Sequence, residues 1–504
     1  MEFIDNALYS LADLLSVVFI IVLGIFTLML IAFYIIDSRQ SRDAVRRNYP
    51  VVGRFRTLFK TLGEFFRHYF FAMDREEMPF NRAERHWITL SSEGRDNTTA
   101  FGSTRPLNIP GTVIFSNCAF PTLDASTIAP PALTIGPYAR QPYTASSIIN
   151  VSGMSFGAIS RPAVQALSAG AKMANCWLNT GEGGLSPYHL EGGCDIVLQI
   201  GTAKYGVRNA SGHLDEARLR EIAVLDQVKM IELKLSQGAK PGKGGILPGA
   251  KVTPEIAEIR GIPAGQDSIS PNRHPEVSNA GELLDYIGYL RDISGKPVGF
   301  KAVVGDSDWL DDLCAEINKR GIEAAPDFIA IDGGDGGTGA APMPLMDNVG
   351  LTLRESLPLV VDTFIRHGLR DRIKVMAAGK LISPVDVAWA YCAGADFVTS
   401  ARGFMFALGC IQALKCNRNI CPTGITTHDP HLQHGLDPQV KSVRVKNFVE
   451  KMRYDVNLIA HSCGVDHPRA LGRQHCRIVQ FDNKSVPLST LHPLPKTPPP
   501  QTKT

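Results

Sequence analysis

Between about residues 148 and 408, apolar and polar positions follow one repeating pattern. A short apolar or β-branched run ends in polar or glycine residues, and a segment with helical periodicity follows it. The eight runs are IINVSGMS, CWLNTG, DIVLQIG, MIELKLSQG, VGFKAVVG, FIAIDGG, IKVMAAG and FVTSARG. Eight parallel strands with helical returns predict an α/β fold of the (β/α)8 TIM-barrel type, and a doubly wound sheet is the competing interpretation.

Three of the helical segments carry recognisable start signals. Ser160 and Asp306 are each predicted to cap a helix, because their side chains can accept a hydrogen bond from a free backbone N–H group. Ser383 with Pro384 starts a third helix, which Gly394 ends.

The N-terminal region contains 23 residues without a charge, from Leu14 to Ile36. A helix of that length is about 35 Å long and spans a hydrocarbon core of about 30 Å. Acidic residues precede it, and Arg39, Arg42, Arg46 and Arg47 follow it. This pattern favours a retained anchor over a signal peptide and predicts a single-pass membrane protein with the rest of the chain on the cytoplasmic side.

The flanking regions differ from the barrel in composition. Residues 54–71 interleave basic and aromatic side chains, which suits a helix in the lipid headgroup region or one packed on the soluble domain. The proline-rich C-terminus is predicted to be disordered. The predicted organisation is a short segment at 1–13, a transmembrane helix at 14–36, a juxtamembrane basic and amphipathic region at 37–100, the barrel at 101–465 and a tail at 466–504.

Charge and cysteine usage narrow the choice of partners and compartment. The chain has 52 basic and 49 acidic residues, and the resulting net charge of +3 is too small to indicate a nucleic-acid partner. The ten cysteines do not form the pattern of a secreted disulfide framework, so a reducing compartment is favoured.

In TIM barrels the chemistry takes place at the C-terminal ends of the strands. Lys234 and Lys301 lie within apolar strands, where an unpaired ammonium group is costly, so an anionic ligand is the expected complement. A Gly- and Pro-rich excursion from Lys240 to about Asn279 is predicted to be an insertion over one mouth of the barrel. The unusual residues at the strand ends are Ser155, Glu182, Lys234, Gln237, Lys240, Lys301, Asp332 and Lys380.

Glycine-rich strand ends indicate a phosphate site. The segments 377–380 and 400–403 end runs seven and eight, where barrels hold phosphate on backbone N–H groups. The segment 328–342 contains G-x-G-x-x-G, but prolines at 342 and 344 interrupt the helix that a Rossmann fingerprint requires. A phosphate-bearing cofactor such as FMN fits this pattern, and glycines that serve tight turns alone are the alternative.

Cys410, Cys416 and Cys421 form a C-x5-C-x4-C run directly after the eighth strand. Zinc sites prefer closer cysteine pairs and four ligands, so zinc fits poorly. Iron–sulfur clusters are held by thiolates, and a proline after a ligand cysteine, as at Pro422, recurs in ferredoxins. An iron–sulfur cluster and three buried structural thiols both remain open from the spacing.

Six motifs together resemble the FMN-binding domain of glutamate synthases, specifically its short stand-alone members. They are VSGMSFGAIS (151–160), NTGEGG (179–184), KLSQGAKPGKGGILPGAKV (234–252), ISPNRH (269–274), GGDGGTGAAP (333–342) and the cysteine run that ends in CPTGI. The resemblance covers roughly residues 100–465.

The resemblance implies specific roles for residues of this chain. FMN is expected at Gly153, Met154, Ser155, Lys301, Gly333, Gly334, Asp335, Gly336, Gly337, Thr338, Gly339, Gly379, Lys380, Arg402 and Gly403. The substrate 2-oxoglutarate is expected at Lys234, Gln237, Lys240, Arg260 and Ser155, with Lys234, Lys240 and Glu182 as catalytic residues. Cys410, Cys416 and Cys421 match the ligands of a [3Fe-4S] cluster.

The implied reaction is the reductive amination of 2-oxoglutarate to glutamate. The N-terminal cysteine of a glutaminase domain is missing, so ammonia or an amine is the expected nitrogen donor. The chain shows no NAD(P)H-binding module, so a ferredoxin or a membrane carrier is the expected electron donor. Oxidation of another oxo or hydroxy acid or amine, and a membrane-tethered electron-transfer or assembly subunit, are the competing hypotheses.

Overall fold

The computed structural model describes residues 2–40, 44–66, 70–126 and 128–496. The chain forms two compact units, Met1–Ala83 and Glu84–Thr504. Helix α4 (Arg82–Ser92) begins at this boundary, and Trp87 Nε1 donates a hydrogen bond to Asp455 Oδ2 at 3.0 Å. The predicted boundary at residue 100 is therefore wrong, because α4 belongs with the larger unit through its contacts with a long C-terminal helix.

The smaller unit consists of α1 (Glu2–Arg39), α2 (Ala44–Asn48) and α3 (Gly53–Phe66). Residues 11–39 of α1 are long and apolar enough to cross a membrane, a test that a signal sequence near the N-terminus also passes. Asp37 is fully buried and accepts hydrogen bonds from Arg46 Nη2 at 2.6 Å and Arg54 Nε at 2.7 Å. This carboxylate joins the end of α1 to α2 and α3. Arg42 and residues 67–69 lie outside the described residues.

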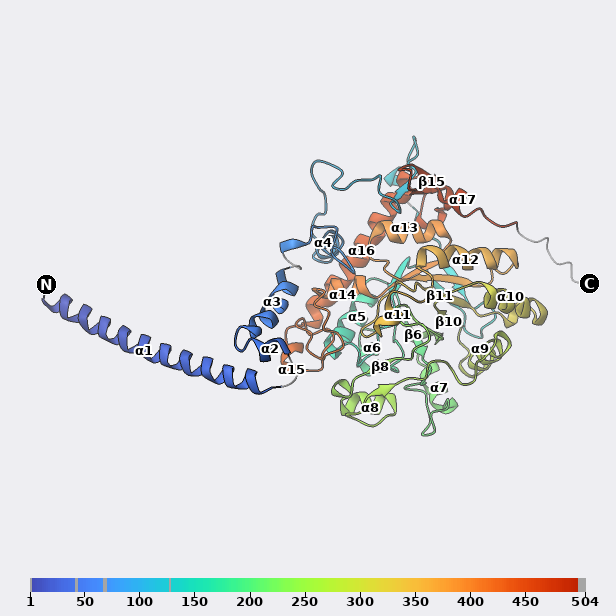
Figure 1. Ribbon diagram of the computed structural model, residues 1–504. Helices are drawn as coiled ribbons and strands as arrows, with labels where there is room; N and C mark the ends of the chain where they lie inside the picture. The colour runs from blue at the N-terminus through green and yellow to red at the C-terminus, as the bar shows by residue number, and fades with distance from the viewer. Residues whose placement is uncertain (1, 41–43, 67–69, 127, 497–504) are drawn as a thin grey trace, which may run out of the picture. The chain divides into compact units, whose positions relative to one another are not determined.

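Eight parallel strands close into a barrel in the larger unit, which confirms the predicted fold class (Figure 1). All eight predicted runs form these strands. In neighbour order they are β10 (Val298–Ala302), β11 (Phe328–Asp332), β12 (Lys374–Ala378), β13 (Phe397–Ser400), β4 (Ile149–Val151), β5 (Leu178–Asn179), β6 (Ile196–Ile200) and β7 (Val228–Lys234).

Helices surround the strands, and Figure 1 shows α9, α10, α12 and α13 along one side of them. Ser160 and Ser383 accept capping hydrogen bonds at the starts of α5 and α13, as predicted. The cap assigned to Asp306 is wrong by one residue, since Ser307 is the N-cap of α10 and Asp306 accepts the Asp308 N–H instead. The helices are α5 (Arg161–Met173), α6 (Pro187–Glu191), α7 (Glu216–Ala223), α9 (Ala280–Ser294), α10 (Asp308–Arg320), α11 (Met343–Met346), α12 (Leu353–Arg366), α13 (Pro384–Ala393), α14 (Arg402–Leu408), α15 (Pro430–Gln433) and α16 (Pro438–Ser462).

An apolar plug closes the N-terminal end of the barrel. The antiparallel pair β2 (Leu133–Ile135) and β3 (Tyr143–Ala145) contributes Ile135, which is fully buried with Trp177 and Phe397. The rings of Trp177 and Phe397 meet edge to face with centroids 5.1 Å apart. This end therefore provides a continuous core beneath the site.

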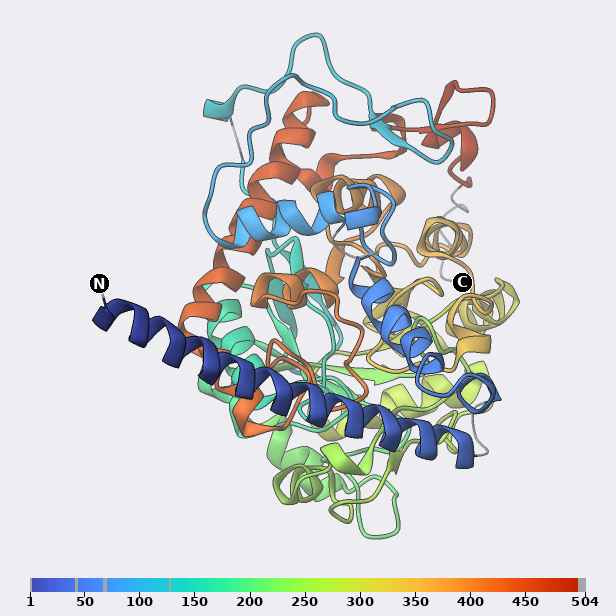
Figure 2. The ribbon, with the colours of Figure 1, turned by 60° about the vertical axis from the view of Figure 1, so that its left-hand side comes forward.

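The long helix α16, red-orange in Figure 2, packs against α5. The two backbones approach closely at Gly170, where an added Cβ would lie 2.5 Å from Val445 Cβ. A side chain at this position would force the helices apart, so the packing requires glycine.

The C-terminal region is ordered over most of its described length, so the prediction of a disordered tail from residue 466 is wrong there. β14 (Cys476–Val479) pairs with β1 (Val113–Phe115) and with β15 (Ser485–Pro487), and α17 (Leu488–Leu491) follows. Arg473 anchors the region through an ion pair with Asp362. Residues 497–504 lie outside the described residues.

The excursion after β7 forms a small cover at the C-terminal mouth. It contains the antiparallel pair β8 (Ile246–Leu247) and β9 (Ser268–Ile269), and α8 (Pro254–Arg260) between them. Ile246, Leu247 and Ser268 line a cavity together with residues from the strand ends. The excursion thus covers the barrel mouth, as predicted.

Candidate active site

Two adjoining cavities occupy the C-terminal mouth of the barrel. The wide cavity, whose wall includes Ser155, Lys240 and Arg260, has about 1080 Å³ of empty space, open solvent included. The narrow cavity, bordered by Gly379, Lys380 and Ser400, has about 580 Å³. The residues that line both cavities are Gly153, Gln199, Lys234, Gln237, Gly337, Ala401 and Arg402.

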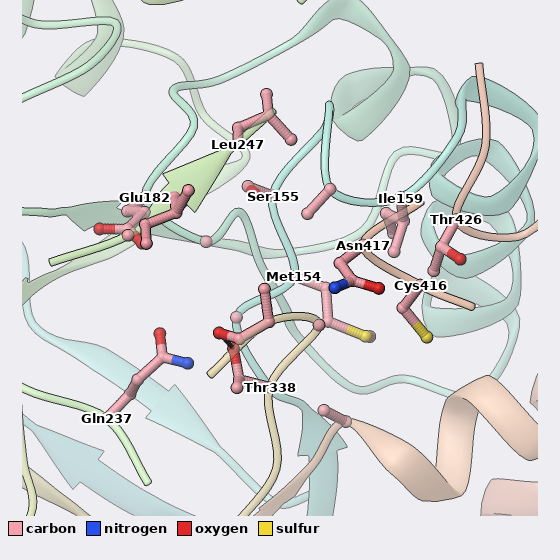
Figure 3. Close-up of a pocket in the computed structure, with 18 of the residues that line it drawn as sticks. Met154, Ser155, Ile159, Glu182, Gln237, Leu247, Thr338, Cys416, Asn417 and Thr426 are labelled. Carbon is pink, nitrogen blue, oxygen red and sulfur yellow. Dashed lines mark hydrogen bonds between the residues drawn. The ribbon is translucent and has the colours of Figure 1, made fainter. Parts of the chain in front are cut away.

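Five cationic side chains line the wide cavity, and they are Lys234, Lys240, Lys251, Arg260 and Arg402. Lys234 ends β7, Lys240 begins the excursion and Arg260 ends α8. Lys234 Nζ donates to Glu182 Oε1 at 2.8 Å and also contacts Gln237 Oε1. Figure 3 shows Glu182 and Gln237 on one side of this cavity, opposite Cys416, Asn417 and Thr426.

Lys240 differs from Lys234 in its partners. It is 4% exposed, and the described residues offer its ammonium no hydrogen bond or ion pair. Burial, together with the charge of Lys234, lowers the pKa of Lys240 to about 8. Burial opposes the ionisation of Glu182, but Lys234, Lys240 and Arg260 outweigh it and lower the pKa of that carboxyl group. The wide cavity thus holds more positive than negative charge.

Arg260 is held in place by weak, neutral contacts. Its Nη2 lies 3.4 Å from Ser155 Oγ and 3.3 Å from the carbonyl oxygen of Phe156, and its Nη1 lies 3.4 Å from Ser268 Oγ. Its buried Nε has no partner among the described residues. The guanidinium also lies over the Tyr205 ring, 5.0 Å from the centroid. A buried guanidinium with an unused donor is suited to an anionic ligand.

The narrow cavity lies at the ends of β12 and β13. Gly379 and Lys380 both have positive φ, +123° and +51°, which turns the backbone sharply at the end of β12. Arg402 begins α14, and its Nη2 donates to the carbonyl oxygen of Thr338 at 2.9 Å. A strained backbone between two cationic residues is typical of a functional site that holds an anion.

The ammonium group of Lys301 is paired with a carboxylate. Its Nζ lies 3.0 Å from Asp332 Oδ2, and the same oxygen accepts the Gly238 N–H at 3.0 Å. Burial opposes the charge, but Asp332 and then Glu232 favour it and raise the pKa of Lys301. Lys234 is similarly paired with Glu182, so the argument from unpaired strand lysines applies in this structure to Lys240 instead.

The glycine loop after β11 divides into two parts. Gly337, Thr338 and Gly339 line the wide cavity. The earlier residues pack away from it, as Leu353 N donates to Asp335 Oδ1 at 3.1 Å and an added Cβ on Gly334 would lie 2.5 Å from the Gly350 carbonyl oxygen. Within the described residues, Gly333, Gly334, Asp335, Gly336 and Gly403 line neither cavity.

A buried polar layer that the sequence motifs did not predict lies beneath the cavities. Glu232 Oε1 accepts hydrogen bonds from Asn179 Nδ2 at 2.8 Å and Gln199 Nε2 at 2.6 Å, all three being buried. A Cβ on Gly153 would lie 2.8 Å from Gln199 Nε2, so only glycine fits above this layer. The available signal was a polar residue at an inward position of an otherwise apolar strand, as in DIVLQIG.

The cysteine loop after α14 faces the same wide cavity. Cys416 lines it, and Cys421 Sγ lies 3.3 Å from Thr423 Oγ1. Burial raises the pKa of Cys410 to about 11, against a hydrogen bond from the Gln412 N–H that lowers it. No group of three His, Cys, Asp or Glu side chains in the described ranges is placed to hold a single metal ion.

Comparisons with known proteins identify relatives of this chain. The family model for the conserved region in glutamate synthase matches residues 133–466. The chain is 38% identical to the glutamate synthase large subunit-like protein YerD of Bacillus subtilis, over 93% of this chain and 97% of that protein. It is 34% identical to the archaeal glutamate synthase [NADPH] of Archaeoglobus fulgidus, over 62% of this chain and 58% of that protein. The recombinant flavin-binding domain of baker's yeast flavocytochrome b2 aligns with a TM-score of 0.45 at 12% identity, over 84% of this chain and 86% of that chain. This TM-score and identity are too low to bear on function.

Proposed function

Because the chain belongs to the glutamate synthase family, we propose that it is an FMN-dependent oxidoreductase that converts 2-oxoglutarate and ammonia, or an amine, to glutamate or its N-substituted form. The observation that carries the proposal is the excess of buried cations in the wide cavity. Lys240 and Arg260 have donors without partners among the described residues. A dianionic acid supplies two carboxylates for these donors, whereas a monoacid supplies one.

The narrow cavity fits the phosphate end of FMN. Gly379 and Lys380 line this cavity at a turn with positive φ, and the side chains of Lys380 and Arg402 add positive charge. Gly153 leaves space above Gln199 that any Cβ would fill, and it adjoins Met154 and Ser155 on the cavity wall. These residues, with Gly337, Thr338 and Gly339, would hold the flavin between the strand ends and the glycine loop.

The residues of the wide cavity supply orientation and a proton. Arg260 and Lys240 bind the substrate carboxylates, and Ser155 lies beside the guanidinium as a further donor. Condensation of the ketone with ammonia expels water, which requires a proton at the departing oxygen. Lys234 Nζ donates that proton, while Glu182 and Gln237 hold the ammonium in position. When bound, FMN supplies the hydride for the imine carbon and the iron–sulfur cluster supplies the electrons that restore the flavin.

The donor set after α14 fits a [3Fe-4S] cluster. The loop carries three cysteine thiols, Cys410, Cys416 and Cys421, which are the ligand type of such clusters, and Cys416 lines the wide cavity. Hydrogen bonds from Thr423 and Thr426 outweigh burial and lower the pKa of Cys421, which favours the thiolate that a cluster needs. A low-potential iron–sulfur protein or a membrane carrier would supply the electrons.

The test uses the full-length holoprotein in detergent without oxygen. We expect its photoreduced flavin to be reoxidised only when 2-oxoglutarate and ammonium are both added, with glutamate as the product. Lys240→Met should reduce kcat/KM for 2-oxoglutarate by about tenfold to a hundredfold, the effect of losing a charge-assisted hydrogen bond of about 1.5–3 kcal/mol. Lys243→Met, an exposed lysine three residues away, is the matched control. A flavin that is reduced but ignores this substrate pair would refute the proposed substrate.

The apolar wall of the wide cavity favours one alternative substrate class. Ile159, Ile246, Leu247 and Met405 line the cavity beside the cations. An oxo acid, hydroxy acid or amine with an apolar portion would contact this wall, which a small dicarboxylate leaves partly uncovered. The same reoxidation assay with a branched-chain oxo acid separates the two: faster turnover than with 2-oxoglutarate selects the alternative.

We also propose that the smaller unit anchors the enzyme to a membrane, with the barrel on the cytoplasmic side. α1 has the length and apolarity of a span, and the basic residues that follow it favour this orientation. The side chains of Phe55, Leu58, Phe59 and Leu62 share one face of α3 and are exposed, beside Arg54, Arg56 and Lys60. Such a face suits a helix in the headgroup region. Release of the full chain from membranes by alkaline carbonate would contradict the anchor.

A further inference from the structure

One buried cation at the mouth has no role in the proposed reaction. Lys251 ends the short 3-10 helix Gly249–Lys251 in the excursion and is 2% exposed. Its Nζ donates to the carbonyl oxygen of Ala158 at 2.7 Å and lies 3.4 Å from that of Cys416. Within the described ranges, no carboxylate forms an ion pair with it.

Two carbonyl groups compensate a buried ammonium only in part. Removing a full charge from water costs on the order of several kcal/mol unless an opposite charge or several strong hydrogen bonds replace the solvent. The neighbouring charge of Arg260 has the same sign and adds to this cost. The contact of Lys251 with the Cys416 carbonyl oxygen places its ammonium beside the cysteine loop. An anionic group held by that loop would supply the opposite charge that Lys251 lacks.

The position of Lys251 is fixed from two directions. Ala158 belongs to the segment after β4 that also contributes Gly153, Met154 and Ser155 to the cavity walls. Cys416 belongs to the loop after α14. By bonding to both, Lys251 holds its charge between the segment assigned to flavin and the loop assigned to the cluster, with little freedom to move away.

We propose that Lys251 is an electrostatic positioning residue for the iron–sulfur cluster, whose buried charge favours the reduced state of the cluster. The inference rests on the proposed function, because it takes Cys410, Cys416 and Cys421 as the ligands. Reduction by one electron makes a thiolate-bound cluster more negative, and a fixed nearby cation stabilises the more negative state more strongly. In the test the electron comes from dithionite, and the cluster is the group reduced.

The experiment measures the midpoint potential of the cluster in the anaerobic full-length holoprotein, by a dithionite titration followed by EPR. Lys251→Gln keeps a hydrogen-bond donor but removes the charge, whereas Lys251→Arg keeps both. We expect the equilibrium constant for reduction to fall about tenfold in the glutamine variant, a shift of 59 mV for a one-electron couple. The arginine variant and Lys243→Gln, an exposed lysine of the same excursion, should remain close to the wild type.

Each other outcome has a defined meaning. A glutamine variant with full iron and an unchanged midpoint potential would overturn the proposal. If that variant also had a raised KM for 2-oxoglutarate, Lys251 would be a substrate ligand instead. If the glutamine variant loses its iron, the arginine variant decides: retained iron supports the need for charge, and lost iron shows that Lys251 only ties the two loops together. A wild-type protein that holds no iron would instead refute the ligand assignment in the proposed function.

Discussion

The two ends of this barrel are built from opposite kinds of side chain. At the N-terminal end, Ile135, Trp177 and Phe397 are buried among other apolar residues. At the C-terminal mouth, Lys240 and Arg260 are almost as deeply buried, yet each has at least one polar donor without a partner among the described residues. The first arrangement contributes to stability, and the second lowers it unless an anion is present.

The backbone shows the same contrast. Ala239 and Lys380, both next to the cavities, have φ of +65° and +51°, a region that costs side-chain-bearing residues of order 1 kcal/mol. None of the apolar residues that plug the N-terminal end has a positive φ. The plug therefore stabilises a mouth that is strained and charged, and the two ends should respond differently to mutation.

The largest effect should come from the apolar end. Trp177→Ala removes a side chain that is 1% exposed and contacts the rings of Phe397 and Tyr143. We expect it to lower the free energy of unfolding by about 3–5 kcal/mol, because the cavity left behind cannot fully collapse. The measurement is a urea unfolding curve of the full chain in detergent.

The control for this variant is an aromatic residue without a packing role. Phe481 is 93% exposed, so Phe481→Ala should leave the unfolding midpoint unchanged. The protein that remains folded in Trp177→Ala should keep its KM for 2-oxoglutarate. A changed KM with unchanged stability would mean that the two ends are not separable.

The apolar end was predictable from the sequence because its signal is local. Each strand is a run such as FIAID or KVMAA, and each run alone indicates a buried strand that needs helices on its outer side. The β1–β14 pairing was missed for the opposite reason. CRIV is short and only partly apolar, and its partner Val113–Phe115 lies more than 350 residues earlier in the chain.

For the C-terminal mouth, the sequence indicated which types of residue line the site but not which side chains pair with one another. Strand-end positions indicated Lys234 and Lys240, the family resemblance added Arg260, and all three side chains line one cavity. The sequence could not show that Glu182 neutralises Lys234, or that Lys251 bonds to Cys416, because these contacts join separate loops. Gly333 and Gly334 show the same limit, since a glycine that serves packing cannot be distinguished in sequence from one that faces a ligand.

A smaller effect should appear in the pH dependence of catalysis at the C-terminal mouth. Burial and the charge of Lys234 lower the pKa of Lys240 to about 8, so its ammonium is charged below that pH and neutral above it. We expect kcat/KM for 2-oxoglutarate, at saturating ammonium, to fall by up to about tenfold per pH unit above pH 8, because this ratio follows the ionisation of the free enzyme.

The variant Lys240→Gln should lack this fall in kcat/KM above pH 8, the alkaline limb of the profile, because glutamine has no ionisable proton in that pH range. If the variant retains the same fall in kcat/KM, another group is responsible, and Lys251 is the first candidate because burial also lowers its pKa to about 8. The binding of the dianion should raise the pKa of Lys240, so the limb should move to higher pH in the pH profile of kcat.

The smallest effect tests whether every residue near the mouth serves the ligand. Ser383 follows β12 at the mouth, but its side chain accepts the Asp386 N–H at the start of α13. Ser383→Ala should lower the free energy of unfolding by about 1 kcal/mol, the usual cost of losing an N-cap, and leave KM unchanged. Ser307 is the matched control, because it occupies the N-cap of α10 without a capping side-chain hydrogen bond, and its alanine variant should lose much less stability. Equal losses in the two variants would show that these serines stabilise their helices by a route other than the cap. A raised KM in Ser383→Ala would place the start of α13 in the ligand site and move the border between the stabilising part and the functional part of the barrel.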